Sequence, residues 1–171
     1  MISVRTEQTG DVPSIRRVIE EAFGRTQEAD VVEKLRATCA ESLSLVAFID
    51  DTLVGHVLFT PAVIETRDGT IEGMGMAPVS VLPDHQRRGV GYELIRTGLA
   101  RLKAKGCPFV IVLGHPEYYP RYGFERASAH NIRCQWNEVP DEAFMILVMD
   151  KAALAGVSGV ARYRSEWDEA V

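Results

Sequence analysis

The sequence predicts an α/β fold in which helices pack on one mixed sheet, and three observations support this prediction. Extended segments with alternating or continuous apolar residues recur between segments with helical periodicity. The fully apolar run from Phe109 to Leu113 is typical of a buried central strand. The 171 residues, 46% of them hydrophobic and 25% charged, are enough for one domain with a substantial core.

The first third of the chain contains a short strand and two amphipathic helices. Residues 2–5 alternate as a strand, and helices follow at about 12–23 and 28–40. Asp11 is expected to cap the first helix, which has Pro13 in its first turn and ends at Gly24. The spacing predicts inward faces formed by Ile15, Val18, Ile19, Ala22 and Phe23 in the first helix and by Val31, Val32, Leu35 and Cys39 in the second.

The remaining elements complete a mixed sheet that begins antiparallel. A hairpin joins strands at 43–49 and 53–65, and a turn then leads to a strand at 70–82. A helix over residues 89–105 follows, with Val90, Leu94, Ile95, Leu99 and Leu102 on one face, and ends at Gly106. It connects the strand at 70–82 to the strand at 109–113 by a right-handed parallel crossover. A brief helical or turn segment at 115–122 precedes strands at about 125–136 and 144–149. Residues 1–150 are therefore predicted to form the domain, with 151–171 as a tail packed on it or at an oligomer contact.

Composition excludes several classes of function. The net charge is −5 and no basic stripe is present, which argues against a nucleic-acid partner. No apolar stretch approaches the ~20 residues that span a bilayer and no signal segment is visible, so a cytoplasmic protein without a membrane partner is expected. Cys39, Cys107 and Cys134 are expected to be reduced and buried. No metal site is expected, since the histidines at 56, 85, 115 and 130 lack ligand spacing.

The segment from His85 to Gly91 is the most informative part of the chain. Gly89 and Gly91 stand between a strand and a helix, where they let the backbone turn tightly and leave its N–H groups uncovered. The beginning of a helix adds unpartnered N–H donors and partial positive charge, and Arg87 and Arg88 add full charges. These features predict an anion cradle, most suited to a pyrophosphate. Neither the P-loop nor the dinucleotide-binding fingerprint occurs.

The pattern Q-x-x-G-x-G, following the strand end Val81-Leu82-Pro83, resembles the acetyl-CoA loop of the GCN5-related N-acetyltransferase (GNAT) family. The segments 77–83, 86–91 and 112–124 together are similar to the YhbS-like branch of that family, and the resemblance covers about residues 2–150. It implies the GNAT fold, with acetyl-CoA as cosubstrate. The implied cofactor-binding residues are Val79, Ser80, Val81, Gln86, Arg87, Arg88, Gly89, Val90, Gly91 and Tyr92.

The resemblance assigns these residues two tasks. Backbone N–H groups of residues 87–92 would hold the pyrophosphate, while the side chains of Arg87 and Arg88 reach either phosphate or solvent. The free backbone edge at Val79, Ser80 and Val81 would pair with the pantetheine arm like an added strand. One N–H of this edge would polarise the thioester carbonyl, a contribution of ~3–4 kcal/mol at the transition state.

The resemblance also implies a catalytic residue, Tyr119, because the family places a tyrosine four residues before a Gly-Phe pair. Its phenol would give a proton to the departing CoA thiolate. Transfer from a pKa of ~10 to one of ~8.5 costs about 2 kcal/mol, or less if the site lowers the phenol pKa. Tyr118 as a wall residue and Tyr122 as a core residue are the rivals, and Tyr119 itself could be a buried aromatic with a satisfied hydroxyl. An asparagine common before this tyrosine is absent, and Gly114 offers the cofactor access to the backbone instead.

Several assignments stay open. The general base could be Glu72, which is the first choice, or Glu117, His115, His56 or water. The expected function is an acetyl-CoA-dependent N-acetyltransferase acting on a small-molecule amine or on a peptide or protein amine. The alternative is a non-catalytic acyl-CoA-binding sensor or interaction module on the same fold. A longer acyl donor and a homodimer are also compatible with the sequence.

Overall fold

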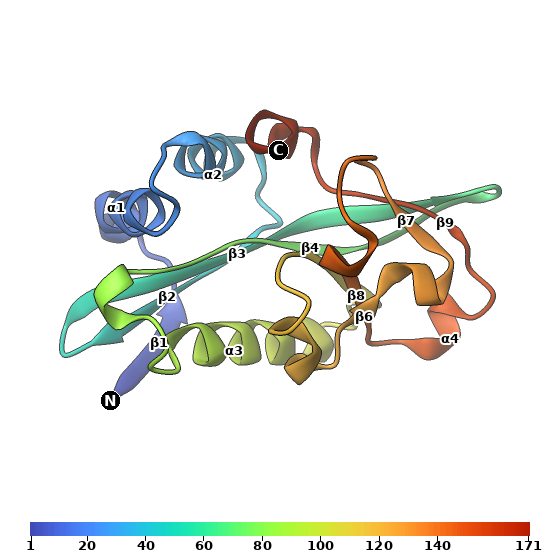
Figure 1. Ribbon diagram of the computed structural model, residues 1–171. Helices are drawn as coiled ribbons and strands as arrows, with labels where there is room; N and C mark the ends of the chain where they lie inside the picture. The colour runs from blue at the N-terminus through green and yellow to red at the C-terminus, as the bar shows by residue number, and fades with distance from the viewer. The chain divides into compact units, whose positions relative to one another are not determined.

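The computed structural model describes residues 1–171 and shows a mixed α/β architecture (Figure 1). The α-helices are α1 (Val12–Phe23), α2 (Gln27–Thr38), α3 (Val90–Ala104) and α4 (Lys151–Leu154). The strands are β1 (Ile2–Thr6), β2 (Leu43–Ile49), β3 (Thr52–Thr66), β4 (Gly69–Val81), β5 (Phe109–Leu113), β6 (Glu125–Arg126), β7 (Ile132–Cys134), β8 (Phe144–Val148) and β9 (Gly159–Arg162). Hydrogen-bonded neighbours follow the order β1-β2-β3-β4-β5-β8-β6, and β9 pairs with β3 and β7. The predicted fold class is confirmed.

The chain forms two compact units. The first contains Met1–Phe59, Ala77–Arg101 and Ser165–Val171, and the second contains Thr60–Met76 and Leu102–Arg164. Strands β3 and β4 and helix α3 each contribute residues to both units. Each unit is described below by itself.

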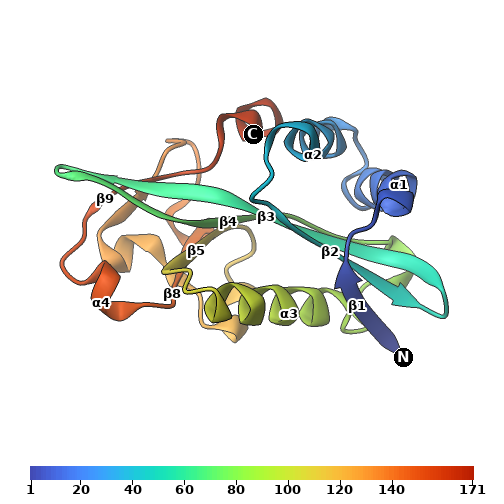
Figure 2. The same ribbon diagram turned by 180° about the vertical axis from the view of Figure 1, so that it is seen from behind.

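The first unit is built on the antiparallel strands β1, β2 and β3. Helices α1 and α2 lie on one face of these strands and α3 lies on the other, as both views show (Figures 1 and 2). The predicted inward residues of α2 are all buried, as are Val90, Leu94, Ile95 and Leu99 of α3. Periodicity therefore identified the packed faces of both helices correctly.

The end of the chain packs on α2 within the first unit. A short 3-10 segment, η6 (Ser165–Ala170), lies beside α2 in both views (Figures 1 and 2). The Trp167 side chain is buried there. Lys34 Nζ lies 2.6 Å from Glu169 Oε1, and Arg25 donates a 3.0 Å hydrogen bond to the carbonyl of Ala170.

The second unit has β5 at its centre, parallel to β4 and antiparallel to β8 (Figure 2). Residues 109–112 of β5 are buried, which confirms the predicted central strand. The parallel pairing of β4 with β5 is the one expected across α3. Part of the predicted tail also belongs to this unit, because β9 pairs antiparallel with β3 and parallel with β7.

One predicted strand is wrong in detail. The strand expected at 125–136 is instead β6 and β7, separated by a 3-10 turn at Ala127–His130. Asn131 ends that turn with φ of 60°, a left-handed conformation that breaks an extended run and that asparagine tolerates. The helical or turn segment expected at 115–122 is confirmed, as turn residues followed by one 3-10 turn, η3 (Tyr119–Tyr122).

Three predictions about side chains are also corrected. The Asp11 carboxylate does not cap α1, because it accepts a 2.7 Å hydrogen bond from the Gln8 N–H and pairs with Arg5 at 2.6 Å. Phe23 is 42% exposed, since the helix ends beside it at the left-handed Gly24. None of the three cysteines is in a disulfide bond, but only Cys39 is buried, and the other two are partly exposed. None of the helices combines the length and the apolarity needed to cross a membrane.

Candidate active site

The predicted phosphate cradle is a turn that leads directly into α3 in the first unit. Arg87 and Gly89 both have positive φ, 62° and 87°. A Cβ at position 89 would meet only the tip of Ile2, at 3.9 Å, so backbone conformation rather than space favours glycine there. The Gly89 carbonyl accepts the first helical hydrogen bond, from the Glu93 N–H at 3.0 Å. The N–H groups at the start of α3 have no helical partner and are free to bind an anion.

Gln86 braces this turn against the end of β4. Its side-chain Nε2 donates a 3.0 Å hydrogen bond to the carbonyl of Val81, the last residue of the strand. The sequence suggested that Gln86 contacts the cofactor. In the structure, one N–H of its side-chain amide is committed to holding the cradle on the strand.

Arg87 and Arg88 are both exposed, and neither forms an ion pair with a carboxylate. Other arginines of the unit are paired, for example Arg36 with Glu7 at 2.8 Å. Two uncompensated guanidinium groups therefore stand beside the uncovered N–H groups. This donor set fits the charge and the hydrogen-bonding capacity of a pyrophosphate.

The β4 edge at Val79, Ser80 and Val81 lies beyond the pairing of β4 with β5. That pairing joins Met74 to Val110, Gly75 to Ile111 and Met76 to Val112. Strand β4 then continues for five further residues, through the cis Ala77–Pro78 peptide to Val81. Ser80 is buried, and its hydroxyl has no hydrogen-bond partner. The backbone at 79–81 has no pairing with β5, as an edge reserved for an added strand requires.

Three tyrosines gather around η3 in the second unit, and their hydroxyl groups are not equivalent. The Tyr118 and Tyr122 hydroxyls are 2.5 Å apart and bond to each other. The Tyr119 hydroxyl makes no hydrogen bond to the protein. Its ring packs edge-on against Tyr118 at 5.1 Å and against Phe124 at 5.9 Å between centroids. Of the three hydroxyls, only that of Tyr119 is not bonded to another side chain of this group.

Gly114 provides the space for the Tyr119 ring. A Cβ at position 114 would lie 2.5 Å from Cε2 of Tyr119, well inside van der Waals contact. The prediction that this glycine opens the backbone to the cofactor is not supported, because the tyrosine ring lies against it. The only sequence feature connected with this packing role is a glycine directly after a buried strand. That feature alone does not indicate a contact with residue 119.

The ionisation of Tyr119 differs from the expectation. Burial raises the pKa of Tyr119 to about 12, and Tyr118 adds to the rise. Against a thiolate of pKa ~8.5, full proton transfer is then uphill by about 5 kcal/mol rather than about 2. The environment keeps the phenol protonated, so it can act as a hydrogen-bond donor while charge develops on sulfur.

The candidates for the general base differ in their exposure to solvent. His56 is fully buried and burial lowers its pKa to about 4, so it is poorly suited to accept a proton from an ammonium group. Glu72 is exposed and lies four residues before Met76 on β4, about 13 Å along the strand. His115 and Glu117 are exposed and lie close to Tyr119 in the sequence.

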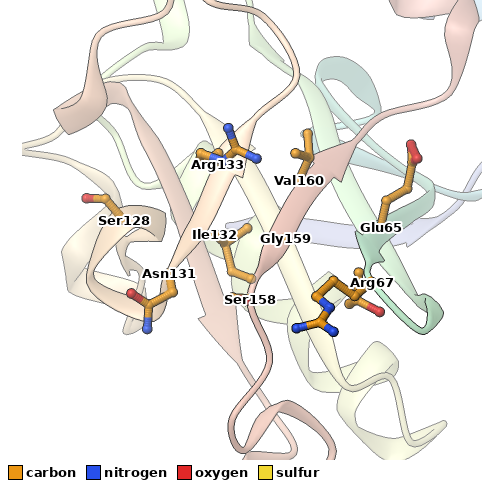
Figure 3. A pocket seen from close by; sticks show the side chains of 10 residues that line it. Glu65, Arg67, Ser128, Asn131, Ile132, Arg133, Ser158, Gly159 and Val160 are labelled. Carbon is orange, nitrogen blue, oxygen red and sulfur yellow. The ribbon is translucent and has the colours of Figure 1, made fainter.

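A shallow pocket of about 500 Å³ lies elsewhere in the second unit, between the end of β3, β7 and β9 (Figure 3). Arg67, Ile132, Arg133 and Val160 are among its lining residues. None of the predicted site residues lines it. No three or more His, Cys, Asp or Glu side chains are grouped to hold a metal ion.

The predicted site residues fall into two groups, one in each unit. The cradle at 86–92 and the strand edge at 79–81 belong to the first unit, where Gln86 connects them. Tyr119 belongs to the second unit, with Gly114 and the other two tyrosines.

The chain is similar in sequence to known proteins over most of its length. The family model "Acetyltransferase (GNAT) domain" matches residues 3–127. The uncharacterized N-acetyltransferase YhbS of Escherichia coli strain K12 is 32% identical over 166 residues, which cover 96% of this chain and 98% of YhbS. The uncharacterized N-acetyltransferase YjhQ of the same strain is 44% identical over 117 residues, which cover 67% of this chain and 65% of YjhQ.

Two solved structures are also similar. That of Escherichia coli YhbS in complex with CoA has a TM-score of 0.89 and 32% identity, covering 98% of this chain and 92% of the other. A GNAT family acetyltransferase from Brucella melitensis in complex with acetyl-CoA has a TM-score of 0.78 and 32% identity, covering 98% of this chain and 99% of the other. Sequence and structure agree that the chain belongs to the GNAT acetyltransferase family.

Proposed function

We propose that the protein transfers an acetyl group from acetyl-CoA to a primary amine by direct attack of the amine on the thioester. The acceptor is a small-molecule amine or a peptide or protein amine. The observation that carries the proposal is the Arg87–Gly89 turn at the start of α3, in which Arg87 and Gly89 have positive φ and Arg87 and Arg88 form no ion pair. The CoA and acetyl-CoA complexes of the similar proteins support the same ligand for this turn.

In this mechanism the strand edge acts on the carbonyl group of the thioester, and the tyrosine acts on its sulfur atom. A backbone N–H of residues 79–81 donates to the carbonyl oxygen as negative charge develops there, a contribution of ~3–4 kcal/mol. The amine nitrogen forms a bond to the carbonyl carbon and loses a proton to a base or water. The carbon–sulfur bond then breaks, and Tyr119 supplies hydrogen bonding and a proton to the sulfur. Its raised pKa keeps that proton in place until the sulfur becomes basic.

The proposal is tested by calorimetric titration of acetyl-CoA and of CoA into the wild type and the Gly89→Glu variant. We expect micromolar binding by the wild type and loss of binding in the variant, because a carboxylate would enter the cradle. Gly106→Glu is the matched control. Gly106 also has positive φ, 81° against 87°, and has no atoms near its Cβ position, so backbone strain and added charge are similar.

The control separates a local effect from general damage. If Gly106→Glu binds as the wild type does while Gly89→Glu does not, the loss belongs to the cradle. Absence of binding by the wild type would remove the cofactor assignment and the proposed activity with it.

A further inference from the structure

The hydroxyl group of Tyr163 lies where the pairing of β4 with β5 ends. Its oxygen is 3.3 Å from the carbonyl oxygen of Met76 and 3.3 Å from that of Ile111. Met76 is opposite Val112 in the last pair of the parallel ladder. A phenol donates a single proton, so the Tyr163 hydroxyl is shared between one carbonyl on each strand and links the two.

The Tyr163 ring is fixed by contacts on several sides. Its backbone N–H donates a 2.6 Å hydrogen bond to Oε1 of Gln135, and its ring stacks on Trp136 with 5.7 Å between centroids. On the β4 side, a Cβ at Gly75 would lie 2.5 Å from Cε1 of the ring. The glycine therefore lets a buried aromatic ring lie directly against the strand, one residue before the strand pairing ends.

The hydroxyl group of Tyr163 is held in its protonated form, as a hydrogen-bond donor requires. Burial raises the pKa of Tyr163, and Tyr119 also contributes to the rise, so the two phenols are near one another. With its pKa raised, the Tyr163 hydroxyl is protonated at neutral pH. Because it faces two carbonyl oxygens, it can act toward them only as a donor.

A ring at this position has a consequence for the strands. Tyr163 places bulk and a hydrogen bond at the last ladder pair, and β4 then continues through Ala77–Val81 without pairing to β5. We propose that Tyr163 is a positioning residue that fixes the point at which β4 leaves β5, and thereby the conformation of residues 77–81. The inference rests on the proposed function in one respect, since residues 79–81 are the edge assigned to the pantetheine arm and the thioester carbonyl.

The test uses Tyr163→Phe, which removes only the hydroxyl, and Gly75→Ala, which keeps the hydroxyl but displaces the ring. Thr60→Val is the matched control, because Thr60 is a buried residue of the same unit whose hydroxyl has no partner. Hydrogen exchange of the backbone amides is measured in the cofactor-free protein, followed by kinetics with acetyl-CoA.

We expect exchange at Leu113 and at residues 79–81 to become about fivefold faster in Tyr163→Phe, the worth of one hydrogen bond. The KM for acetyl-CoA should rise by a similar factor, while the KM for the amine stays unchanged. Gly75→Ala should act in the same direction, and Thr60→Val should match the wild type in both measurements.

The two readouts separate failure of this inference from failure of the proposed function. Unchanged exchange at residues 79–81 in both Tyr163→Phe and Gly75→Ala would overturn the inference, whatever the activity. If the wild type neither binds nor uses acetyl-CoA, the proposed function fails, and the exchange measurement still decides whether Tyr163 sets the end of the ladder.

Discussion

Tyr118, Tyr119 and Tyr122 are chemically alike, and at the residue scale only their hydroxyl contacts distinguish them. The sequence favoured Tyr119 by its distance from Gly123 and Phe124, which rests on resemblance to the family pattern. The structure adds an independent reason, since the other two hydroxyls bond to each other at 2.5 Å. The raised pKa was not foreseeable, because burial of one ring depends on contacts from distant parts of the chain.

Removing the Tyr119 hydroxyl tests its catalytic role. We expect Tyr119→Phe to lower kcat by about 100-fold, at the lower end of the range for general acid catalysis, with unchanged affinity for CoA. Steady-state kinetics and calorimetry measure the two quantities. Tyr122→Phe is the matched control, since it removes a phenol from the same turn, and its kcat should change far less. Equal losses in the two variants, or wild-type turnover in Tyr119→Phe, would contradict the assignment of Tyr119, whereas binding of CoA without turnover by the wild type would favour the sensor alternative.

At the scale of elements, the spacing of apolar residues predicted the helix faces and strands that packing determines. It did not predict the strand break that depends on the backbone angle of a single residue. The faces of α2 and α3 and the buried β5 follow from the spacing of apolar residues, and these predictions are confirmed. The division of the strand expected at 125–136 depends on the left-handed Asn131, and asparagine adopts that conformation without being required to. The pairing of β9 with β3 and β7 is a contact distant in sequence, which no local pattern shows.

The packing of η3 against the end of β5 depends on one missing Cβ. Gly114→Ala would place a carbon 2.5 Å from the Tyr119 ring, and the ring or η3 must move. We expect a loss of stability of about 1–3 kcal/mol, typical of an overpacked site, and a lower kcat with CoA affinity unchanged. Urea unfolding and the kinetic assay measure these effects. Gly10→Ala serves as control because its Cβ position is open. A kcat equal to that of the wild type would show that the position of Tyr119 is not critical.

At the scale of the whole molecule, a local motif in the sequence predicted the anion-binding turn, whereas no local pattern predicted the polar network around the buried His56 in the first unit. His56 Nε2 lies 2.9 Å from Ser44 Oγ, and Ser44 donates a 2.7 Å hydrogen bond to Glu7. Arg36 completes the network by pairing with Glu7 at 2.8 Å. These residues come from three strand regions and α2, so only the folded chain brings them together. With Ser44 donating to Glu7, Nε2 of His56 carries the proton and its buried Nδ1 has no partner.

This network predicts how the stability of the protein depends on pH. Burial lowers the pKa of His56 from 6.5 to about 4, with Glu7 opposing the shift and Arg36 adding to it. The unfolded chain therefore binds a proton that the folded chain does not bind between those values. The contribution of His56 to stability is fully present above pH 6.5 and is lost as the pH falls toward 4, by about 3 kcal/mol in all.

Urea unfolding of the wild type and His56→Gln at several pH values from 7 to 4 measures this contribution. Glutamine keeps a hydrogen-bonding amide near Ser44 but cannot be protonated, so its unfolding free energy should fall less steeply between pH 6.5 and 4. Glu7 acts mainly below its ordinary pKa of 4.5 in both proteins, because Arg36 and Ser44 lower its pKa against the opposing effect of burial and His56 is only the smallest contributor. The difference between the two curves therefore isolates the histidine. Parallel curves over this range would mean that His56 titrates equally in both states and is not held neutral by the fold.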